Sequence, residues 1–327
     1  NLATDKGVVV FNTPGGNANA VKELVICGLL LSSRGIIQGH QFAQSLSNKN
    51  ADELTNIVET NKKHFKGNEL KGKTIGIIGL GAIGSLVAQS VVNMGMNIIG
   101  YDPNISIDAA WQLPKEVVKA DNLKDLLSNS DYISIHVPLV EETNNLISND
   151  VLKFVKPGAK LINLSRGAIV NNKDVLNALE NKKISSFVTD FPTPEMVKRS
   201  MEFSDVILLP HLGASTKEAE INCAVMAAEQ AYKFLKDGEI VNSVNFPKIK
   251  LGRTTTYRLV IIHKDEPGVL GNITGEIASH SLNIPDMINK SRNEIAITVI
   301  DLVEEPTQVI IDNLKEIINV LSVRLCK

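Results

Sequence analysis

A glycine-rich turn between two strongly apolar segments is the feature of this sequence that most restricts its fold. The segment before the turn, residues 73–79, is typical of a fully buried β-strand. After the turn, residues 85–94 show a helical pattern and residues 97–101 read as a second buried strand. A strand, a glycine turn, a helix and a strand in this order predict a βαβ unit of a parallel sheet.

The turn itself, Gly79-Leu-Gly81-Ala-Ile-Gly84, is typical of a dinucleotide site. Gly79 makes the tight turn, Gly81 lets the backbone approach a pyrophosphate, and Gly84 lets helix and strand pack closely. Asp102 ends the second strand, where a carboxylate would accept hydrogen bonds from ribose hydroxyls. Residues 103–108 offer no Arg or Lys for the extra phosphate of NADP, so we predict NAD as the cofactor. A glycine turn without a ligand is the alternative.

The alternation of strands and helices continues along the chain. Residues 17–65 form a helical stretch ahead of the first strand, and a helical pattern recurs at residues 174–180. Further short apolar runs lie at residues 132–136, 160–164, 187–189 and 206–209. The alternation predicts an α/β fold with a Rossmann-type, doubly wound parallel sheet.

The carboxy-terminal part follows a different order of elements. A long amphipathic helix is expected at residues 217–236, and the segment with Pro247 and Gly252 is typical of a linker. Beyond it the patterns run strand, helix, strand, strand, helix, strand, at residues 258–263, 269–280, 283–289, 294–302, 307–318 and 322–325. This βαββαβ order is typical of a ferredoxin-like domain.

Composition narrows the class of partner. The 327 residues carry a formal net charge of -2, which gives no broad basic field for nucleic acid or an anionic membrane. The three cysteines, Cys27, Cys223 and Cys326, are far apart and odd in number, so neither a disulfide framework nor a metal site is predicted. Without a signal peptide or an apolar run of about 18 residues, we expect a cytoplasmic protein with a small-molecule substrate.

Three polar residues follow predicted strands, at the sheet edge where open α/β sheets place ligands. Arg166 follows a buried strand, and its planar guanidinium could clamp a substrate carboxylate. His211 also follows a strand, and an imidazole there can exchange a proton with a hydroxyl near neutral pH. Glu195 lies in the turn after Asp190, where a carboxylate beside His211 would raise the imidazole pKa and fix its tautomer. Each alone is more often a surface or structural residue; together they predict a catalytic group.

These residues carry a resemblance to a known family. Asn163-Leu-Ser-Arg166-Gly-Ala, Asp190-x4-Glu195 and Pro210-His211-Leu-Gly213, in this order behind the glycine turn, resemble the D-isomer-specific 2-hydroxyacid dehydrogenase family over most of residues 7–247. The resemblance implies that Arg166, Glu195 and His211 are catalytic. The usual Asp-Val-Phe-x-x-Glu-Pro has become Asp-Phe-Pro-Thr-Pro-Glu here, but the offset of five from Asp190 to Glu195 survives. Beyond the three glycines, the resemblance puts cofactor contacts at Ala82, Ile83, Asp102, Val137, Leu164, Asp190, His211, Gly213 and Ala214.

The last segment has a second resemblance. His263-Lys-Asp265-Glu-Pro-Gly268-Val-Leu-Gly271, with Asn283 later, resembles the ACT domains, which commonly bind amino acids where the first strand turns into the first helix. The resemblance implies an effector site at His263, Asp265, Gly268 and Asn283. Serine-binding members have Asn at the position of Asp265, and a carboxylate there could repel the serine carboxylate. A role in assembly alone is the alternative.

An ACT domain behind this dehydrogenase pattern is typical of 3-phosphoglycerate dehydrogenases, so the resemblance implies oxidation of 3-phospho-D-glycerate by a homodimer or homotetramer. A glyoxylate or hydroxypyruvate reductase and a non-enzymatic, NAD-gated interaction protein are the alternatives. The expected domains are an NAD-binding domain at 14–215, a linker at 248–256 and an ACT domain at 257–327. Residues 1–13 and 216–247 would be the remnant of a flavodoxin-like substrate-binding domain. Since family members carry a substantial segment before Asn12, we expect this chain to turn over substrate poorly.

Overall fold

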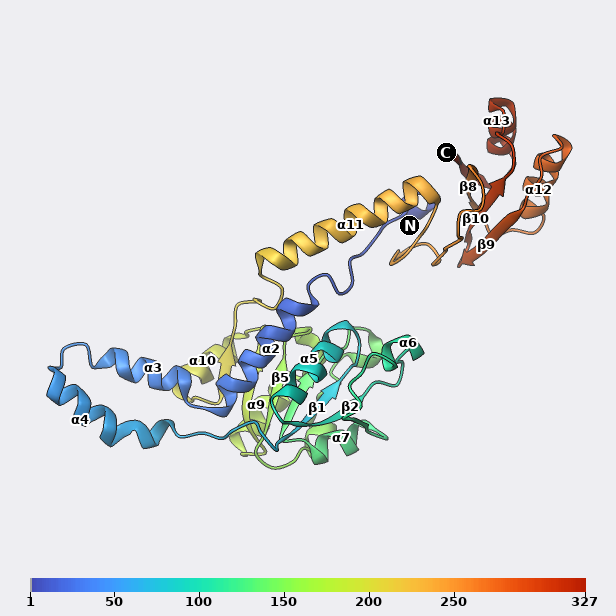
Figure 1. The fold of residues 1–327 in the computed structure, drawn as a ribbon. Helices are drawn as coiled ribbons and strands as arrows, with labels where there is room; N and C mark the ends of the chain where they lie inside the picture. The colour runs from blue at the N-terminus through green and yellow to red at the C-terminus, as the bar shows by residue number, and fades with distance from the viewer. Residues whose placement is uncertain (1) are drawn as a thin grey trace. The chain divides into compact units, whose positions relative to one another are not determined.

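The computed structural model describes residues 2–327, which divide into two compact units (Figure 1). Residues 17–220 form one unit, and residues up to Gly16 together with Ile221–Lys327 form the other. The long helix α11 (Lys217–Asp237) runs across the division. None of the helices in the described part of the chain has the length and apolar character needed to cross a membrane.

A parallel sheet forms the centre of the larger unit. Its strand order among the described residues is β3-β2-β1-β4-β5-β6-β7, so the order reverses between β1 and β4. The glycine turn follows β1 at this switch point, where open parallel sheets bind ligands. The strands are β1 (Thr74–Ile78), β2 (Asn97–Tyr101), β3 (Val117–Lys119), β4 (Tyr132–Ile135), β5 (Ala159–Asn163), β6 (Ile184–Thr189) and β7 (Val206–Leu208).

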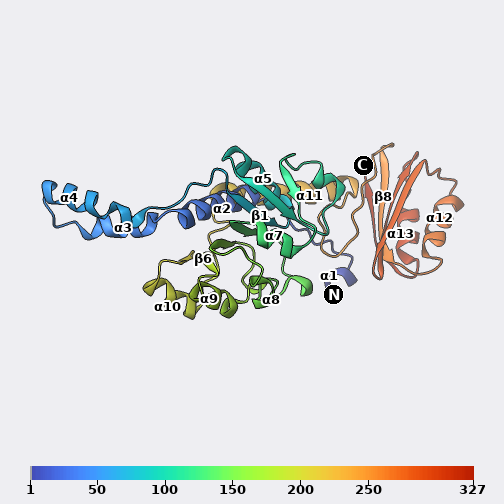
Figure 2. The ribbon, with the colours of Figure 1, turned by 90° about the horizontal axis from the view of Figure 1, so that it is seen from below.

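Helices cover both faces of this sheet (Figure 2). On one face, α2 (Ala18–Ser33) and α5 (Ala82–Asn93) bury an apolar stripe that includes Val25, Leu29 and Val87. The other face is covered by α7 (Leu123–Asn129), α8 (Asn149–Leu152), α9 (Asn172–Glu180) and α10 (Pro194–Glu202). Two apolar layers on one sheet explain why its strands read as continuous apolar runs.

The remaining elements of this unit are short, and most of them add little to its core; of η3, Ile169 is buried in the core. Between α2 and β1, α3 (Ile36–Ser45), α4 (Ala51–Asn61) and the 3-10 turn η1 (Lys62–Phe65) bury none of their residues. Figure 2 shows α3 and α4 leading away from the sheet. The others are α6 (Ile107–Ala110), η2 (Glu141–Thr143) and η3 (Gly167–Ile169).

The smaller unit has the predicted βαββαβ order. Its elements are β8 (Tyr257–Lys264), α12 (Val269–Ser279), β9 (Asp286–Arg292), β10 (Ile295–Leu302), α13 (Gln308–Glu316) and β11 (Val320–Cys326), with the short α1 (Leu2–Asp5) near the chain start. The sheet is antiparallel in the order β11-β8-β10-β9. Helices α12 and α13 pack on one face through Ile273 and Leu314, and residues such as Phe246 and Ile249 cover the other.

A buried ion pair, Arg258–Asp301, stabilises the smaller unit. Arg258 and Asp301 are 1% and 0% exposed, with Arg258 Nε 2.6 Å from Asp301 Oδ1 and Nη2 3.0 Å from Oδ2. The guanidinium also donates to the carbonyls of Asp237, Leu251 and Gly252. The end of α11 and the segment after it are therefore tied to β8 and β10.

Several segments have a structure that their sequence pattern did not specify. Residues 8–11 are an apolar run with three valines, but they form no strand, and Phe11 makes a single bridge, to Ser243. The strand expected from Asn283 begins at Asp286, after Pro285, whose ring removes a ladder donor. Within the segment expected as a linker, 248–256, Ile249 is buried and forms a bridge with Ile240. The division into a substrate-domain remnant, linker and ACT domain stays a prediction.

Candidate active site

The glycine turn has the shape that a pyrophosphate requires. Gly79 has a φ of +89°, and a Cβ there would lie 2.6 Å from the carbonyl oxygen of His136. A Cβ at Gly84 would lie 2.0 Å from the carbonyl oxygen of Gly79, so neither position accepts a side chain. A Cβ at Gly81 would meet nothing within 4 Å, and α5 begins at the next residue, Ala82. The exposed backbone at the start of a helix therefore fits the phosphates of NAD.

Asp102 lies beside this turn. Its Oδ2 accepts a hydrogen bond from the backbone N–H of Leu80 at 2.9 Å, and its Oδ1 accepts one from Asn104 at 3.0 Å. Each oxygen keeps a further lone pair for a ribose hydroxyl. The carboxylate thus joins the end of β2 to the glycine turn and leaves a negative charge where an NADP 2′-phosphate would have to lie.

His136 follows β4 on the other side of the turn, next to Val137. Its Nε2 lies 2.8 Å from the hydroxyl oxygen of Ser134. Burial lowers the pKa of His136 to about 4, so the imidazole is neutral at physiological pH. His136 borders the glycine turn without adding a positive charge. The sequence did not reveal that Ser134 is its hydrogen-bond partner.

Asp190 holds the loop that carries His211. It is 1% exposed, and its two carboxylate oxygens accept hydrogen bonds from the backbone N–H groups of Leu212 and Gly213, each at 2.7 Å. His211 has a φ of +56°, a left-handed conformation that costs a non-glycine residue about 1 kcal/mol or more. The two bonds fix the backbone directly after His211 and so help to hold this conformation.

The His211 side chain is exposed and meets an aromatic ring. The rings of Phe191 and His211 lie 5.1 Å apart in an edge-to-face arrangement. Phe191 also packs under Gly167, where an added Cβ would lie 3.2 Å from the Phe191 Cβ. Phe191 was not among the predicted site residues, although its place directly after Asp190 at a strand end was a usable signal.

Arg166 and Glu195 also lie at the carboxyl edge of the sheet, with exposed side chains. The Arg166 carbonyl accepts a hydrogen bond from Asn163 Nδ2 at 3.0 Å, which shapes the loop after β5. Glu195 lies in the first turn of α10, where its own backbone N–H and the Thr193 hydroxyl lower its pKa. No hydrogen bond or ion pair joins Glu195 to His211 in the described part of the chain, because Thr193 and Pro194 start a helix there.

The other predicted cofactor contacts surround the same edge. Leu164 is 6% exposed at the end of β5, Gly213 is buried in the loop held by Asp190, and Ile83 lies in the first turn of α5. Within residues 2–327, no group of three or more His, Cys, Asp or Glu side chains is arranged to hold a metal ion.

Comparison with known proteins decides the family. A model described as "D-isomer specific 2-hydroxyacid dehydrogenase, NAD binding domain" matches residues 28–213, more than half of the chain. The chain belongs to this family. The matching model is that of an NAD-binding domain, so NAD is the cofactor of the larger unit, in line with the glycine turn.

Two relatives are named D-3-phosphoglycerate dehydrogenase. The protein of Methanocaldococcus jannaschii is 35% identical over 88% of this chain and 52% of its own length. The protein of Haemophilus influenzae is 31% identical over 99% of this chain and 77% of its own length. The chain therefore spans about half the length of the first relative.

Solved structures of the same fold include D-lactate dehydrogenase with NAD+ from Lactobacillus jensenii. It is 27% identical, with a TM-score of 0.58, and the match covers 71% of this chain and 70% of that one. D-mandelate dehydrogenase of Rhodotorula graminis is 24% identical, with a TM-score of 0.63 over 75% of this chain and 70% of that one. The second likeness shows the fold alone.

The predicted effector residues of the smaller unit differ in exposure. His263 is 2% exposed; its Nδ1 lies 2.8 Å from the Lys264 carbonyl oxygen and its Nε2 2.9 Å from the Thr298 hydroxyl oxygen. Both ring nitrogens are therefore used within the protein. Asp265 and Asn283 lie closer to the surface, and Gly268 has a φ of +87° directly before α12.

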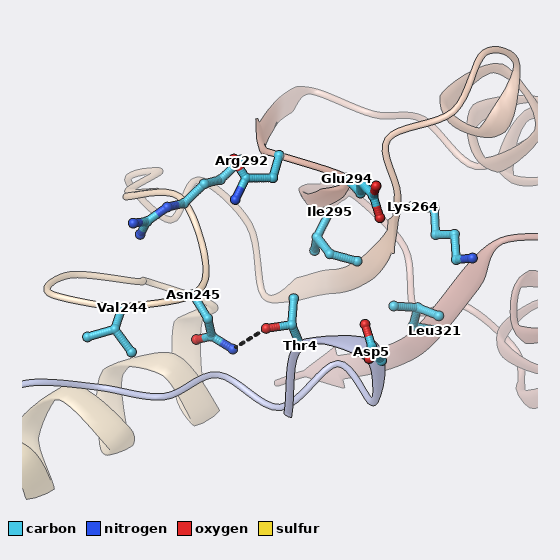
Figure 3. A pocket seen from close by; sticks show the side chains of 10 residues that line it. Thr4, Asp5, Val244, Asn245, Lys264, Arg292, Glu294, Ile295 and Leu321 are labelled. Carbon is cyan, nitrogen blue, oxygen red and sulfur yellow. Dashed lines mark hydrogen bonds between the residues drawn. The ribbon is translucent and has the colours of Figure 1, made fainter. Parts of the chain in front are cut away.

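A hollow of about 540 Å³ in the same unit involves none of these four residues. Figure 3 shows the hydrogen bond between Thr4 and Asn245, with Arg292 and Lys264 on opposite sides. Acidic and basic side chains alternate around it, so it has no clear preference for one sign of charge. The sequence analysis did not predict this hollow.

Removing the Asp102 carboxylate is expected to narrow the preference for NAD over NADP. Asp102→Ala loses both the ribose acceptor and the charge that repels a 2′-phosphate. Asp102→Asn keeps an acceptor for the Leu80 N–H and so separates the two effects. Fluorescence titration measures the dissociation constants of NAD and NADP, and the ratio of the two constants gives the preference. Equal NAD and NADP constants in the unmutated protein would contradict the role of the carboxylate.

Proposed function

We propose that this protein oxidises 3-phospho-D-glycerate to 3-phosphohydroxypyruvate with NAD, the first step of serine biosynthesis. The single observation that carries the proposal is that Arg166, after β5, and His211, after β7, lie at the same carboxyl edge of the sheet that presents the glycine turn. The names of the two relatives support the choice of substrate over other 2-hydroxy acids.

In the proposed reaction His211 acts as the base. Its exposed imidazole takes the proton from the substrate C2 hydroxyl, while the Arg166 guanidinium holds the carboxylate through paired hydrogen bonds. Bound NAD supplies the hydride acceptor. Phe191 and Asp190 keep the imidazole and its backbone in position. The Glu195 carboxylate would stabilise the imidazolium by turning from Thr193 towards His211.

Steady-state kinetics with a panel of 2-hydroxy and 2-keto acids test the proposal. The natural protein that contains this sequence should show its highest kcat/KM with 3-phospho-D-glycerate or its 2-keto product. A higher kcat/KM with glyoxylate or hydroxypyruvate would show that the protein is a reductase of those acids instead. NAD binding without turnover of any acid would assign a non-enzymatic, NAD-gated role.

We further propose that the smaller unit is an ACT domain that binds serine near Asp265, Gly268 and Asn283, in a homo-oligomeric, cytoplasmic protein. The element order and the free backbone before α12 support this site. His263 would act through its buried contacts instead of touching the ligand directly.

Asp265→Asn is expected to strengthen serine binding about 10-fold, because it removes a charge that repels the ligand carboxylate. Isothermal calorimetry of both proteins measures the change. Glu266→Gln removes a neighbouring charge and serves as the control. If titration with serine gives no heat of binding in either the unmutated protein or the Asp265→Asn variant, and the domain is folded, assembly remains as the role of the smaller unit.

A further inference from the structure

A second hollow in the larger unit lies at the amino ends of the strands, the sheet edge opposite to the glycine turn. Its volume is about 670 Å³. It is bordered by the last turn of α2, which is labelled in Figure 1, and by the first residues of β5 and β6. Residues 64–68 and Ser204 complete the wall. Neither the cofactor site nor the proposed catalytic residues share a residue with it.

The wall of this hollow is basic. Arg34, His64, Lys66 and Lys160 line it, and no Asp or Glu does. The hydroxyls of Ser32, Ser33 and Ser185 already donate to backbone carbonyls. The hydroxyls of Ser186 and Ser204 also line the hollow and have no acceptor in the described part of the chain, so they remain as donors. Asp131, the carboxylate that acts on the Lys160 ammonium, is already paired with Lys156 at 2.7 Å. The hollow therefore presents positive charge and hydrogen-bond donors together.

Lys160 is half-buried without a counterion. Its ammonium lies 5.1 Å from the centre of the Tyr132 ring, and the structure gives it no ion-pair partner within residues 2–327. Burial lowers the pKa of Lys160, as expected for an ammonium in poorly hydrated surroundings. A bound anion would compensate this desolvation.

Ser186 is an independent sign of a ligand. It lies opposite Lys160 in the register of β5 and β6 and is 5% exposed. Its hydroxyl has no hydrogen-bond partner in the described part of the chain. The nearby hydroxyls of Ser33 and Tyr132 bond to each other at 2.8 Å, so the missing partner is particular to Ser186. Buried hydroxyls without a partner are rare and point to a missing water, ion or ligand.

We propose that this hollow is a binding site for a phosphate group, either free phosphate or the phosphate of a small metabolite. Lys160 and Arg34 supply the positive charge, and Ser186 donates a hydrogen bond. Phosphate fits better than a carboxylate because its additional oxygens match the several hydroxyl and cationic donors of the wall. Since the site is remote from the carboxyl edge, it does not depend on the proposed dehydrogenase activity.

Calorimetric titration of the natural protein with inorganic phosphate tests the site, with and without saturating NAD to occupy the glycine turn. Lys160→Gln should weaken phosphate binding about 10-fold or more, because a charge-assisted contact is lost. Lys153→Gln removes an exposed lysine outside the hollow and should leave binding unchanged. Potassium chloride at equal ionic strength controls for screening.

Ser186→Ala keeps the proposal testable if Lys160→Gln does not fold. It should not lower the melting temperature without phosphate, because the hydroxyl has no partner, but it should reduce the shift that phosphate causes. Titration with glycerol 3-phosphate distinguishes the two possible ligands. If it binds more tightly than inorganic phosphate, the ligand is a phosphorylated metabolite. If the two bind equally, the ligand is free phosphate. Phosphate binding that is unchanged in both variants, or that chloride reproduces, overturns the site.

Discussion

Turnover is expected to fall about 100-fold or more when His211 or Arg166 is replaced with alanine, while the dissociation constant for NAD stays nearly unchanged. His211 is exposed at the carboxyl edge of the sheet, so its loss removes the proposed base without opening the core. Arg166 is likewise exposed, and its loss removes the paired bonds to the substrate carboxylate.

Steady-state kinetics and cofactor titration of the same preparations measure both effects. His211→Asn is a useful second variant, since Asn tolerates the left-handed backbone at this position. His280→Ala is the control, because this histidine lies at the surface of the smaller unit, where its Nε2 is 3.1 Å from Glu276 Oε1. Near-normal turnover in a folded His211 or Arg166 variant would refute the role given to that residue.

Arg258→Ala is expected to lower the free energy of unfolding of the smaller unit by about 3–5 kcal/mol. The substitution leaves the Asp301 carboxylate buried without its cation and removes the donors to three backbone carbonyls. Calorimetric unfolding measures the change. The double variant Arg258→Met/Asp301→Leu should cost far less, because no charge is left buried. Lys315→Ala, which breaks an exposed pair with Asp312, should change the free energy by under about 1 kcal/mol.

The same pair predicts a dependence on pH. Burial alone would raise the pKa of Asp301, but hydrogen bonds from Arg258 and Thr254 outweigh it and lower the pKa. A depressed pKa contributes stability that is complete above the unfolded value of about 4 and is lost as the pH falls through the folded value. The loss of stability below about pH 4 should therefore be smaller in the double variant, and an identical acid profile would contradict this.

The sequence predicted the fold well where a segment is buried on both faces. The run at residues 132–136 was predicted as a strand, and β4 covers residues 132–135, all of them buried. The strand at residues 97–101 was predicted with the bounds that β2 has in the structure, although β2 is only partly buried. The strand β3 was missed, because Val118 and Lys119 are exposed at the sheet edge and show no apolar pattern. Conversely, the run at residues 8–11 looks apolar, but it finds no strand to pair with beyond the bridge at Phe11.

The candidate site was predicted as a set of residues but not as a set of contacts. Spacing after strands located Arg166 and His211 at one edge, since the carboxyl ends of parallel strands meet there. It could not show that Glu195 turns towards Thr193, because this depends on the cap of α10. Nor could it find the basic hollow, because Arg34, Lys160 and Ser186 are brought together only by the register of the sheet and the end of α2.

The left-handed backbone at His211 has a consequence for protein engineering. Glycine would remove the cost of about 1 kcal/mol or more at this position, and asparagine would lower it, whereas histidine keeps the strain and supplies the imidazole. A library selected only for resistance to heat would therefore tend to lose His211, and with it the proposed chemistry. Selection schemes for this protein need a catalytic readout at each round, since at this position thermal tolerance and turnover favour different residues.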